Sequence, residues 1–134
     1  MKFEIIEKTC KAIENRKARS AWDKGVKIYA LDLITAVEDR ATYEGRTPAD
    51  ANELREWMMN GAKNWKEYSY GGCALICDED IAETLCTPSE LKRKRGGELQ
   101  PNSTETWLDV QARALYQASR IAVWAYRGEL KKEA

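Results

Sequence analysis

The feature that most constrains the fold is a long stretch of helical periodicity near the C-terminus, over residues 104–127. Its apolar residues recur three and four positions apart, which places them on one side of an α-helix. They are Trp107, Leu108, Val110, Leu115, Ala118, Ile121, Ala122 and Ala125. Trp124 lies off this arc or widens it, and Ser103 or Asn102 can cap the first turn. The charged residues 128–134 are expected to fray.

Two more amphipathic helices are predicted in the first part of the chain. The narrow stripe over residues 3–13 consists of Phe3, Ile6, Cys10 and Ile13. The clearer pattern over residues 20–40 consists of Trp22, Val26, Tyr29, Ala30, Leu33, Ala36 and Val37. Ile28, Leu31 and Ile34 broaden the second stripe, so this helix can be buried on two sides.

The stretch Thr-Pro-Ala-Asp at 47–50 is a helix start signal. Thr47 can cap, Pro48 suits the first helical position, and Asp50 would lie at the positive end of the helix dipole. The helix that follows would turn its apolar side inward through Leu54, Trp57 and Met58.

These signals predict one all-α domain over residues 1–134, a bundle of five to seven helices with a long C-terminal helix. There is room for a small two-stranded element near 70–78. The length of 134 residues suits a single core, and 43% hydrophobic with 33% charged residues is typical of a globular protein. No apolar run approaches the roughly 18 residues that span a bilayer, and the N-terminus is too charged for a secretory signal. A cytoplasmic protein without a membrane partner is expected.

Composition also restricts the chemistry. The chain has no histidine, which excludes serine–histidine and cysteine–histidine nucleophile pairs and histidine metal sites. The spacing of Cys73 and Cys77 differs from that of zinc knuckles, and the glycine pair before Cys73 lacks the Lys-Ser/Thr of a phosphate-binding loop. Asp78, Glu79 and Asp80 are better explained as a helix cap and first turn than as a magnesium site. We therefore predict a non-enzymatic protein without metal or cofactor.

The segment 80–95 has the pattern of a helix-turn-helix. Thr87, Pro88 and Glu90 form a capping-box sequence that predicts a second helix, which Gly96-Gly97 would end. Its exposed polar residues would face a DNA groove or phosphates. They are Ser89, Lys92, Arg93 and Arg95. The alternative is an ordinary capped helix corner, whose cations complement the negative end of the second helix.

The charges are also segregated along the chain, although 22 basic and 22 acidic residues cancel overall. Residues 8–27 carry seven cations against two carboxylates, and residues 32–56 carry seven carboxylates against three cations. Such a dipolar surface could meet nucleic acid at its basic end or another protein at either end. Solvated helix faces would give the same counts.

Three aromatic residues, Trp65, Tyr68 and Tyr70, lie close together before a glycine pair. They could anchor a protein partner or stack on bases. They could equally close the side of a small core, with their polar atoms reaching backbone carbonyls.

Residues 64–120, from the Tyr-Ser-Tyr-Gly-Gly-Cys stretch to the middle of the last helix, resemble a family of small uncharacterised proteins of phages and conjugative elements of gut Firmicutes. The resemblance implies an accessory gene of mobile DNA, such as a regulator or an inhibitor of host defence. The leading hypothesis is a nucleic-acid-associated regulator that binds DNA through residues 80–95. The alternatives are a protein-binding inhibitor of the anti-CRISPR type, which uses the aromatic cluster or the dipolar surface, and a structural homodimer built on the long C-terminal helix.

Overall fold

The computed structural model describes residues 3–59, 86–93, 99–101 and 103–133. This part of the chain is mainly α-helical, as predicted. Its helices are α1 (Glu4–Glu14), α2 (Ala21–Glu44), a helix over 51–59, and α5 (Thr104–Glu133). The predicted five to seven helices are therefore more than the described residues contain. The first helix of the predicted helix-turn-helix, before Cys86, and the strands predicted near 70–78 lie outside the described residues.

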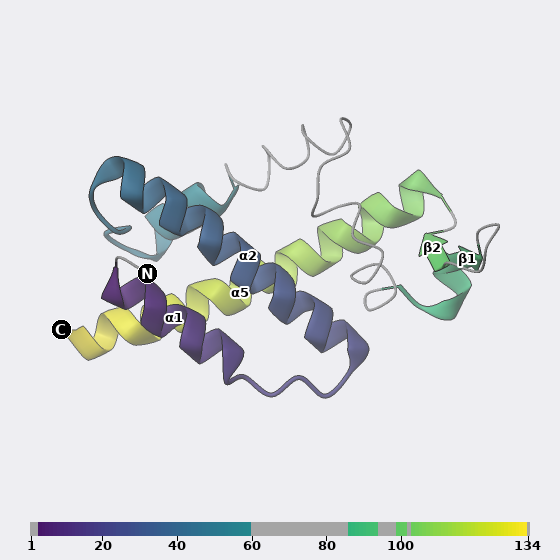
Figure 1. Cartoon of the computed structure of the whole chain (residues 1–134), viewed down its shortest axis with the longest axis horizontal. Coiled ribbons are helices and arrows are strands. Elements are labelled where there is room, and N and C mark those ends of the chain that lie inside the picture. Colours follow the sequence, from purple (N-terminus) through teal and green to yellow (C-terminus); the bar gives the residue numbers. More distant parts are fainter. Residues whose placement is uncertain (1–2, 60–85, 94–98, 102, 134) are drawn as a thin grey trace.

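The architecture rests on the crossing of the two long helices. Figure 1 shows α2 crossing α5, with α1 beside both and both chain termini at the same end. α1 and α2 run in opposite directions and are joined by a short connection over residues 15–20. None of the described helices is long and apolar enough to cross a membrane.

The core lies where the large side chains of α2 pack against a row of small residues on α5. The large residues of α2 are Val26, Tyr29, Leu33, Ile34 and Val37. The small residues of α5 are Ala114, Ala118, Ala122 and Ala125. Because small residues allow helix axes to approach closely, the alanines of α5 admit the bulky side of α2.

The polar atoms of the core are satisfied by specific bonds. The amide of Gln111 donates to the Tyr29 hydroxyl at 3.3 Å. The hydroxyl of Tyr126, itself fully buried, donates to the backbone carbonyl of Pro48. The second bond attaches the segment before the helix 51–59 to α5. Leu54, Trp57 and Met58 of that helix are buried, as the sequence predicted.

Local cap residues account for both ends of α2 and for the start of α5. The Ser20 hydroxyl accepts from the Asp23 amide at 3.0 Å at the start of α2, and Gly45, with φ of 73°, ends that helix in the left-handed conformation. The Ser103 hydroxyl accepts from the Thr106 amide at 3.1 Å and caps α5.

Two predicted helix ends are wrong. Asp50, not Thr47, caps the helix 51–59, because its carboxylate accepts from the Glu53 amide at 2.8 Å. α5 also continues through the predicted fraying tail to Glu133. Glu129 is buried there and accepts from Lys132 at 3.1 Å, so tertiary packing holds a segment that composition alone describes as charged and loose.

The predicted second helix of the 80–95 corner is absent. Pro88–Glu90 forms one 3-10 turn (η1), and β1 (Leu91–Arg93) follows at once. β1 pairs antiparallel with β2 (Leu99–Pro101), with Leu91 opposite Pro101. Fewer than ten residues separate Thr87 from the glycine pair, and so short a helix is only marginally stable. The strand pairing satisfies the same backbone groups with a partner instead.

Candidate functional site: a basic pocket beside α5

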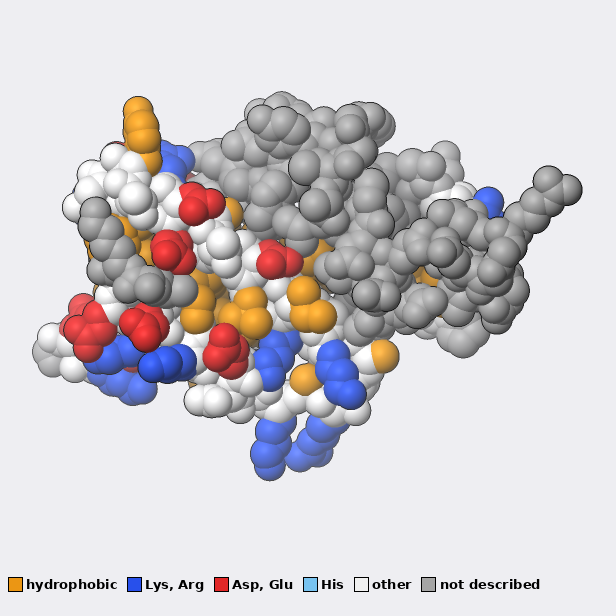
Figure 2. Space-filling model, in the orientation of Figure 1, with side chains coloured by type: hydrophobic (Ala, Val, Ile, Leu, Met, Phe, Trp, Pro, Cys, Tyr) orange, Lys and Arg blue, Asp and Glu red, His pale blue; other side chains and the backbone are white. Residues whose placement is uncertain are grey.

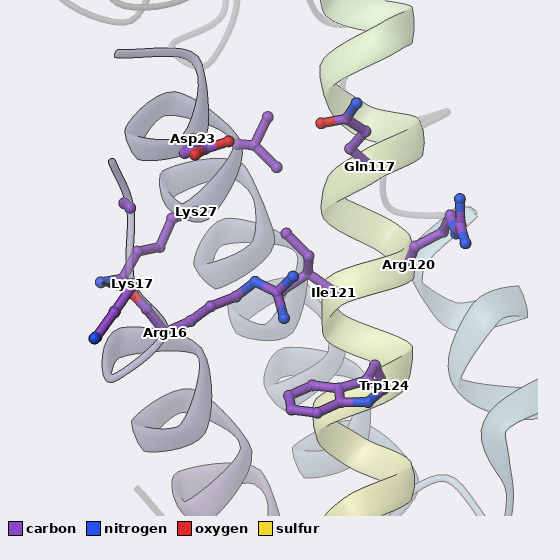
Figure 3. Close-up of a pocket in the computed structure, with 10 residues that line it drawn as sticks. Arg16, Lys17, Asp23, Lys27, Gln117, Arg120, Ile121 and Trp124 are labelled. Atoms are coloured by element: carbon purple, nitrogen blue, oxygen red, sulfur yellow. Dashed lines mark hydrogen bonds between the residues drawn. The ribbon is translucent and has the colours of Figure 1, made fainter. Parts of the chain in front are cut away.

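A pocket of about 470 Å³ lies between the α1–α2 connection, the first turns of α2 and the middle of α5. Figure 3 shows the α5 residues on one side and those of the connection and α2 on the other. The pocket is lined by Arg16, Lys17, Ala18, Asp23, Val26, Lys27, Gln117, Arg120, Ile121 and Trp124. Its volume is within the range of roughly 300–1,000 Å³ that is typical of ligand sites.

The connection between α1 and α2 is held in place by its own polar contacts. The Arg16 amide donates to the Ile13 carbonyl at 3.1 Å, which closes the end of α1. The ammonium group of Lys27, in the second turn of α2, donates to the Arg16 carbonyl at 3.1 Å. Ser20 then caps α2. The backbone that carries Arg16 and Lys17 is therefore fixed at both ends.

The aromatic wall of the pocket is Trp124. Its side chain is 65% exposed, and the guanidinium carbon of Arg16 lies 5.5 Å from the ring centroid. Figure 3 shows Arg16 reaching from the connection toward Ile121 and Trp124, whereas Lys17 points away from α5. Arg120 lies on the other flank of α5, 5.8 Å from the Tyr116 ring centroid. Arg16 is thus the cation that faces across the pocket, and the others form its rim.

The opposite end of the pocket is a polar wall built by a chain of contacts. The indole of Trp22 donates to the side-chain oxygen of Gln117 at 2.7 Å, which leaves the amide nitrogen of Gln117 as a donor. The guanidinium carbon of Arg113 lies 5.7 Å from the Trp22 ring centroid. Arg113 also donates to Glu90 at 3.2 Å, and so connects the turn before β1 to the pocket wall.

Glu90, at the end of this series of contacts, is held in place by hydrogen bonds. Its carboxylate accepts from the Thr87 amide at 2.8 Å, so one half of the predicted capping box forms, although it stabilises a 3-10 turn. The other half does not form, because the Thr87 hydroxyl donates to the Glu90 carboxylate at 3.0 Å and the Glu90 amide donates to the Thr87 backbone carbonyl. This backbone hydrogen bond, followed by the Thr87 hydroxyl and Arg113, lowers the pKa of Glu90 below its usual range.

Several basic residues away from the pocket are engaged in ion pairs. On α1, Lys8 pairs with Glu4 at 3.1 Å and Lys11 with Glu7 at 3.5 Å. In the carboxylate-rich segment over residues 32–56, Arg46 pairs with Glu53. Within the described residues, by contrast, no carboxylate pairs with the cations that surround the pocket. Arg16, Lys17, Lys27 and Arg120 line it, and Arg19 and Lys24 lie beside these residues in the sequence. Other described cations also have no carboxylate partner, but they do not line the pocket; they are Arg55, Lys92, Arg127 and Lys131.

The surface view agrees with this distribution. In Figure 2, basic side chains project from the lower edge, where the α1–α2 connection lies in Figure 1. Asp23 is the one carboxylate among the pocket-lining residues. The pocket therefore has a strong positive excess in a chain whose formal net charge is zero.

The residues predicted to contact DNA are not presented by a helix. Ser89 and Lys92 are exposed, but Ser89 lies in the 3-10 turn and Lys92 in β1. Arg93 ends β1, and Arg95 lies outside the described residues. The Ser89 hydroxyl is 3.1 Å from that of Thr87, within the turn itself. The predicted protein-binding residues, Trp65, Tyr68 and Tyr70, also lie outside the described part of the chain.

The sequence contained part of the signal for the pocket. The excess of cations over residues 8–27 was visible, and so was the position of Trp124 off the apolar arc of its helix. Gln117 and Arg120 gave no signal, because polar residues on the outer side of a helix are ordinary. What brings these residues together is the crossing of α2 and α5, which no local pattern encodes.

The cysteines give no metal centre in the part of the structure that is described. Cys10 is half-buried and Cys86 is buried. Cys73 and Cys77 lie outside the described residues. Within those residues, no three cysteine, aspartate or glutamate side chains are arranged to hold a metal ion.

No protein-family model, curated protein or solved structure matches this chain. The mobile-element context that the resemblance implied therefore stays a prediction.

Proposed function

We propose that this chain is a nucleic-acid-associated binding protein without catalytic activity, which holds a phosphate backbone along the rim of the basic pocket. The observation that carries the proposal is the group of cations between Arg16 and Lys27 that have no carboxylate partner among the described residues. A regulatory role on mobile DNA is compatible with this proposal and stays a prediction.

Phosphate is the anion that this arrangement suits best. Guanidinium and ammonium groups form short, charge-assisted hydrogen bonds to phosphate oxygens. Because the rim cations are not engaged in ion pairs, no existing salt bridge has to break before they bind an anion. A row of separate exposed cations also suits a ligand with repeating negative charges better than it suits a ligand with a single carboxylate.

The pocket is a better candidate than the segment 80–95. A helix-turn-helix reads a groove with a rigid second helix, and β1 replaces that helix here. Lys92 remains exposed and could still add a phosphate contact from the hairpin. Reversing the charge of one basic region is therefore expected to affect nucleic-acid binding differently from reversing the charge of the other.

The test compares two triple variants with the same change in net charge. The first replaces Lys17, Arg19 and Lys24 with glutamate, and the second replaces Lys92, Arg93 and Arg95 with glutamate. Binding of a labelled oligonucleotide is measured by fluorescence anisotropy over a series of salt concentrations. The first variant is expected to lower the slope of log affinity against log salt by about 2 to 3, because three phosphate contacts are lost. The second should change the slope less.

Three results would contradict the proposal. In the first, the native protein fails to bind any oligonucleotide at low salt. In the second, polyglutamate of similar length competes as well as the oligonucleotide, which would point to an acidic protein partner. If only the Lys92, Arg93 and Arg95 variant loses binding, the hairpin and not the pocket is the nucleic-acid contact.

A further inference from the structure

Trp124 has an aromatic face that the protein itself does not cover. The ring is 65% exposed although Arg16 lies 5.5 Å from its centroid. Large apolar side chains are usually withdrawn from water, and a tryptophan exposed inside a pocket is typical of a binding surface. The indole is also bordered by the apolar side chain of Ile121, which lines the same pocket.

The sequence of α5 keeps this face open. Side chains four residues apart on a helix lie one above the other, and each leans toward the N-terminus. The side chain at position 128 would therefore lean toward Trp124, but that residue is Gly128. A Cβ added at Gly128 would meet nothing within 4 Å, so packing does not require glycine there. Glycine inside a helix costs about 1 kcal/mol relative to alanine, and it places no side chain on this flank of Trp124.

From these contacts we propose that the pocket binds single-stranded nucleic acid by stacking one unpaired base on Trp124. The inference rests on the proposed function and specifies its ligand. The base lies on the uncovered part of the indole, and Arg16 stays against the ring from its own side. The amide nitrogen of Gln117 is free to donate to a base or sugar oxygen. The cations of the rim hold the phosphates on either side.

A single strand fits these features better than a duplex does. The stacking surface is in a pocket between elements and not on a projecting helix, so a base must leave its stack to reach it. Aromatic side chains beside a basic track are typical of proteins that bind single strands without reading sequence. An acidic peptide would satisfy the cations but leave the aromatic ring without a flat partner.

The experiment distinguishes the contribution of the base to binding from the contribution of the phosphate backbone. Binding is measured for a thymidine oligomer, for an abasic oligomer of the same length and charge, and for a duplex of the same length. The native protein is expected to bind the thymidine oligomer roughly five- to hundredfold more tightly than the abasic one, the range measured for one stacked base. Trp124→Ala should remove this difference, and should weaken binding of the thymidine oligomer much more than binding of the abasic one.

Two further variants make the test specific. Trp124→Phe keeps a ring and should keep most of the preference for bases. Gly128→Leu changes no charge, places a side chain over the indole and should reduce the preference as Trp124→Ala does. Both positions are exposed, so thermal unfolding of each variant should resemble that of the native protein or, for Gly128→Leu, occur at a higher temperature.

Equal binding of the thymidine and abasic oligomers by the native protein would overturn base stacking while leaving phosphate binding intact. So would an undiminished preference for bases in Trp124→Ala, or tighter binding of the duplex than of the single strand. Failure to bind even the abasic oligomer at low salt would instead remove the proposed function, and the stacking inference with it.

Discussion

At the scale of single residues, burial controls the chemistry of the described cysteines. Burial raises the pKa of the Cys10 thiol to about 11, and the nearby carboxylates of Glu14, Glu38 and Glu7 act in the same direction. Burial also raises the pKa of Cys86, an effect that Glu90 strengthens and Arg113 opposes. Since the thiolate is the reactive form, both cysteines are expected to be poor nucleophiles at neutral pH.

The pKa of Cys10 can be tested by alkylation. In a variant with Cys73, Cys77 and Cys86 replaced by alanine, the rate of reaction with iodoacetamide should rise around pH 11 in the folded protein, and around pH 9 in urea. The unfolded thiol loses its proton first, so the stability contributed by Cys10 is complete below pH 9 and declines as the pH rises toward 11. A folded-state reaction that rises near pH 9 would show that the thiol is accessible to solvent.

At the scale of elements, the glycine that ends α2 and the glycine within α5 have opposite effects on stability. Gly45 has φ of 73° and ends α2, which is a conformation that side chains disfavour. Gly128 lies within α5, where a Cβ would meet nothing within 4 Å. We therefore expect Gly45→Ala to destabilise the protein by about 1 kcal/mol and Gly128→Ala to stabilise it by about 1 kcal/mol.

Urea denaturation followed by circular dichroism measures both changes in the free energy of unfolding. The two substitutions add the same methyl group, so each is the control for the other. A loss of stability in Gly128→Ala would mean that the glycine serves packing after all, in disagreement with the open space beside it.

Some of these elements could be predicted from the sequence, and the hairpin could not. The starts of α2 and α5 depend on Ser20 and Ser103, and a serine cap can be recognised locally. The hairpin could not be predicted, because the bond from Thr87 to Glu90 closes a 3-10 turn as well as it closes an α-helical one. The choice between them depends on strand pairing with Leu99–Pro101, which a local cap signal does not include.

At the scale of the whole molecule, the candidate site is a product of tertiary structure. Arg16 and Trp124 lie in distant parts of the sequence, and they meet because α1 and α2 turn back on each other beside α5. The basic run and the off-arc tryptophan were each visible in the sequence, but nothing local linked them. The function proposed for the pocket therefore depends on how closely α2 can approach α5.

That dependence leads to a prediction about Ala118, which is fully buried on α5 between two turns that line the pocket. Leucine at this position would push α2 away, because a well-packed core does not accept extra methylene groups without strain. Ala118→Leu is expected to lower the free energy of unfolding by about 1–3 kcal/mol and to weaken oligonucleotide binding, since it displaces Gln117 and Ile121. Ala112→Leu, on the exposed side of the same helix, should change stability by less than about 0.5 kcal/mol. Urea denaturation and anisotropy measured on both variants test this. Equal effects of the two substitutions would mean that the contact between α2 and α5 is loose, and that the pocket is not held in shape by the core beneath it.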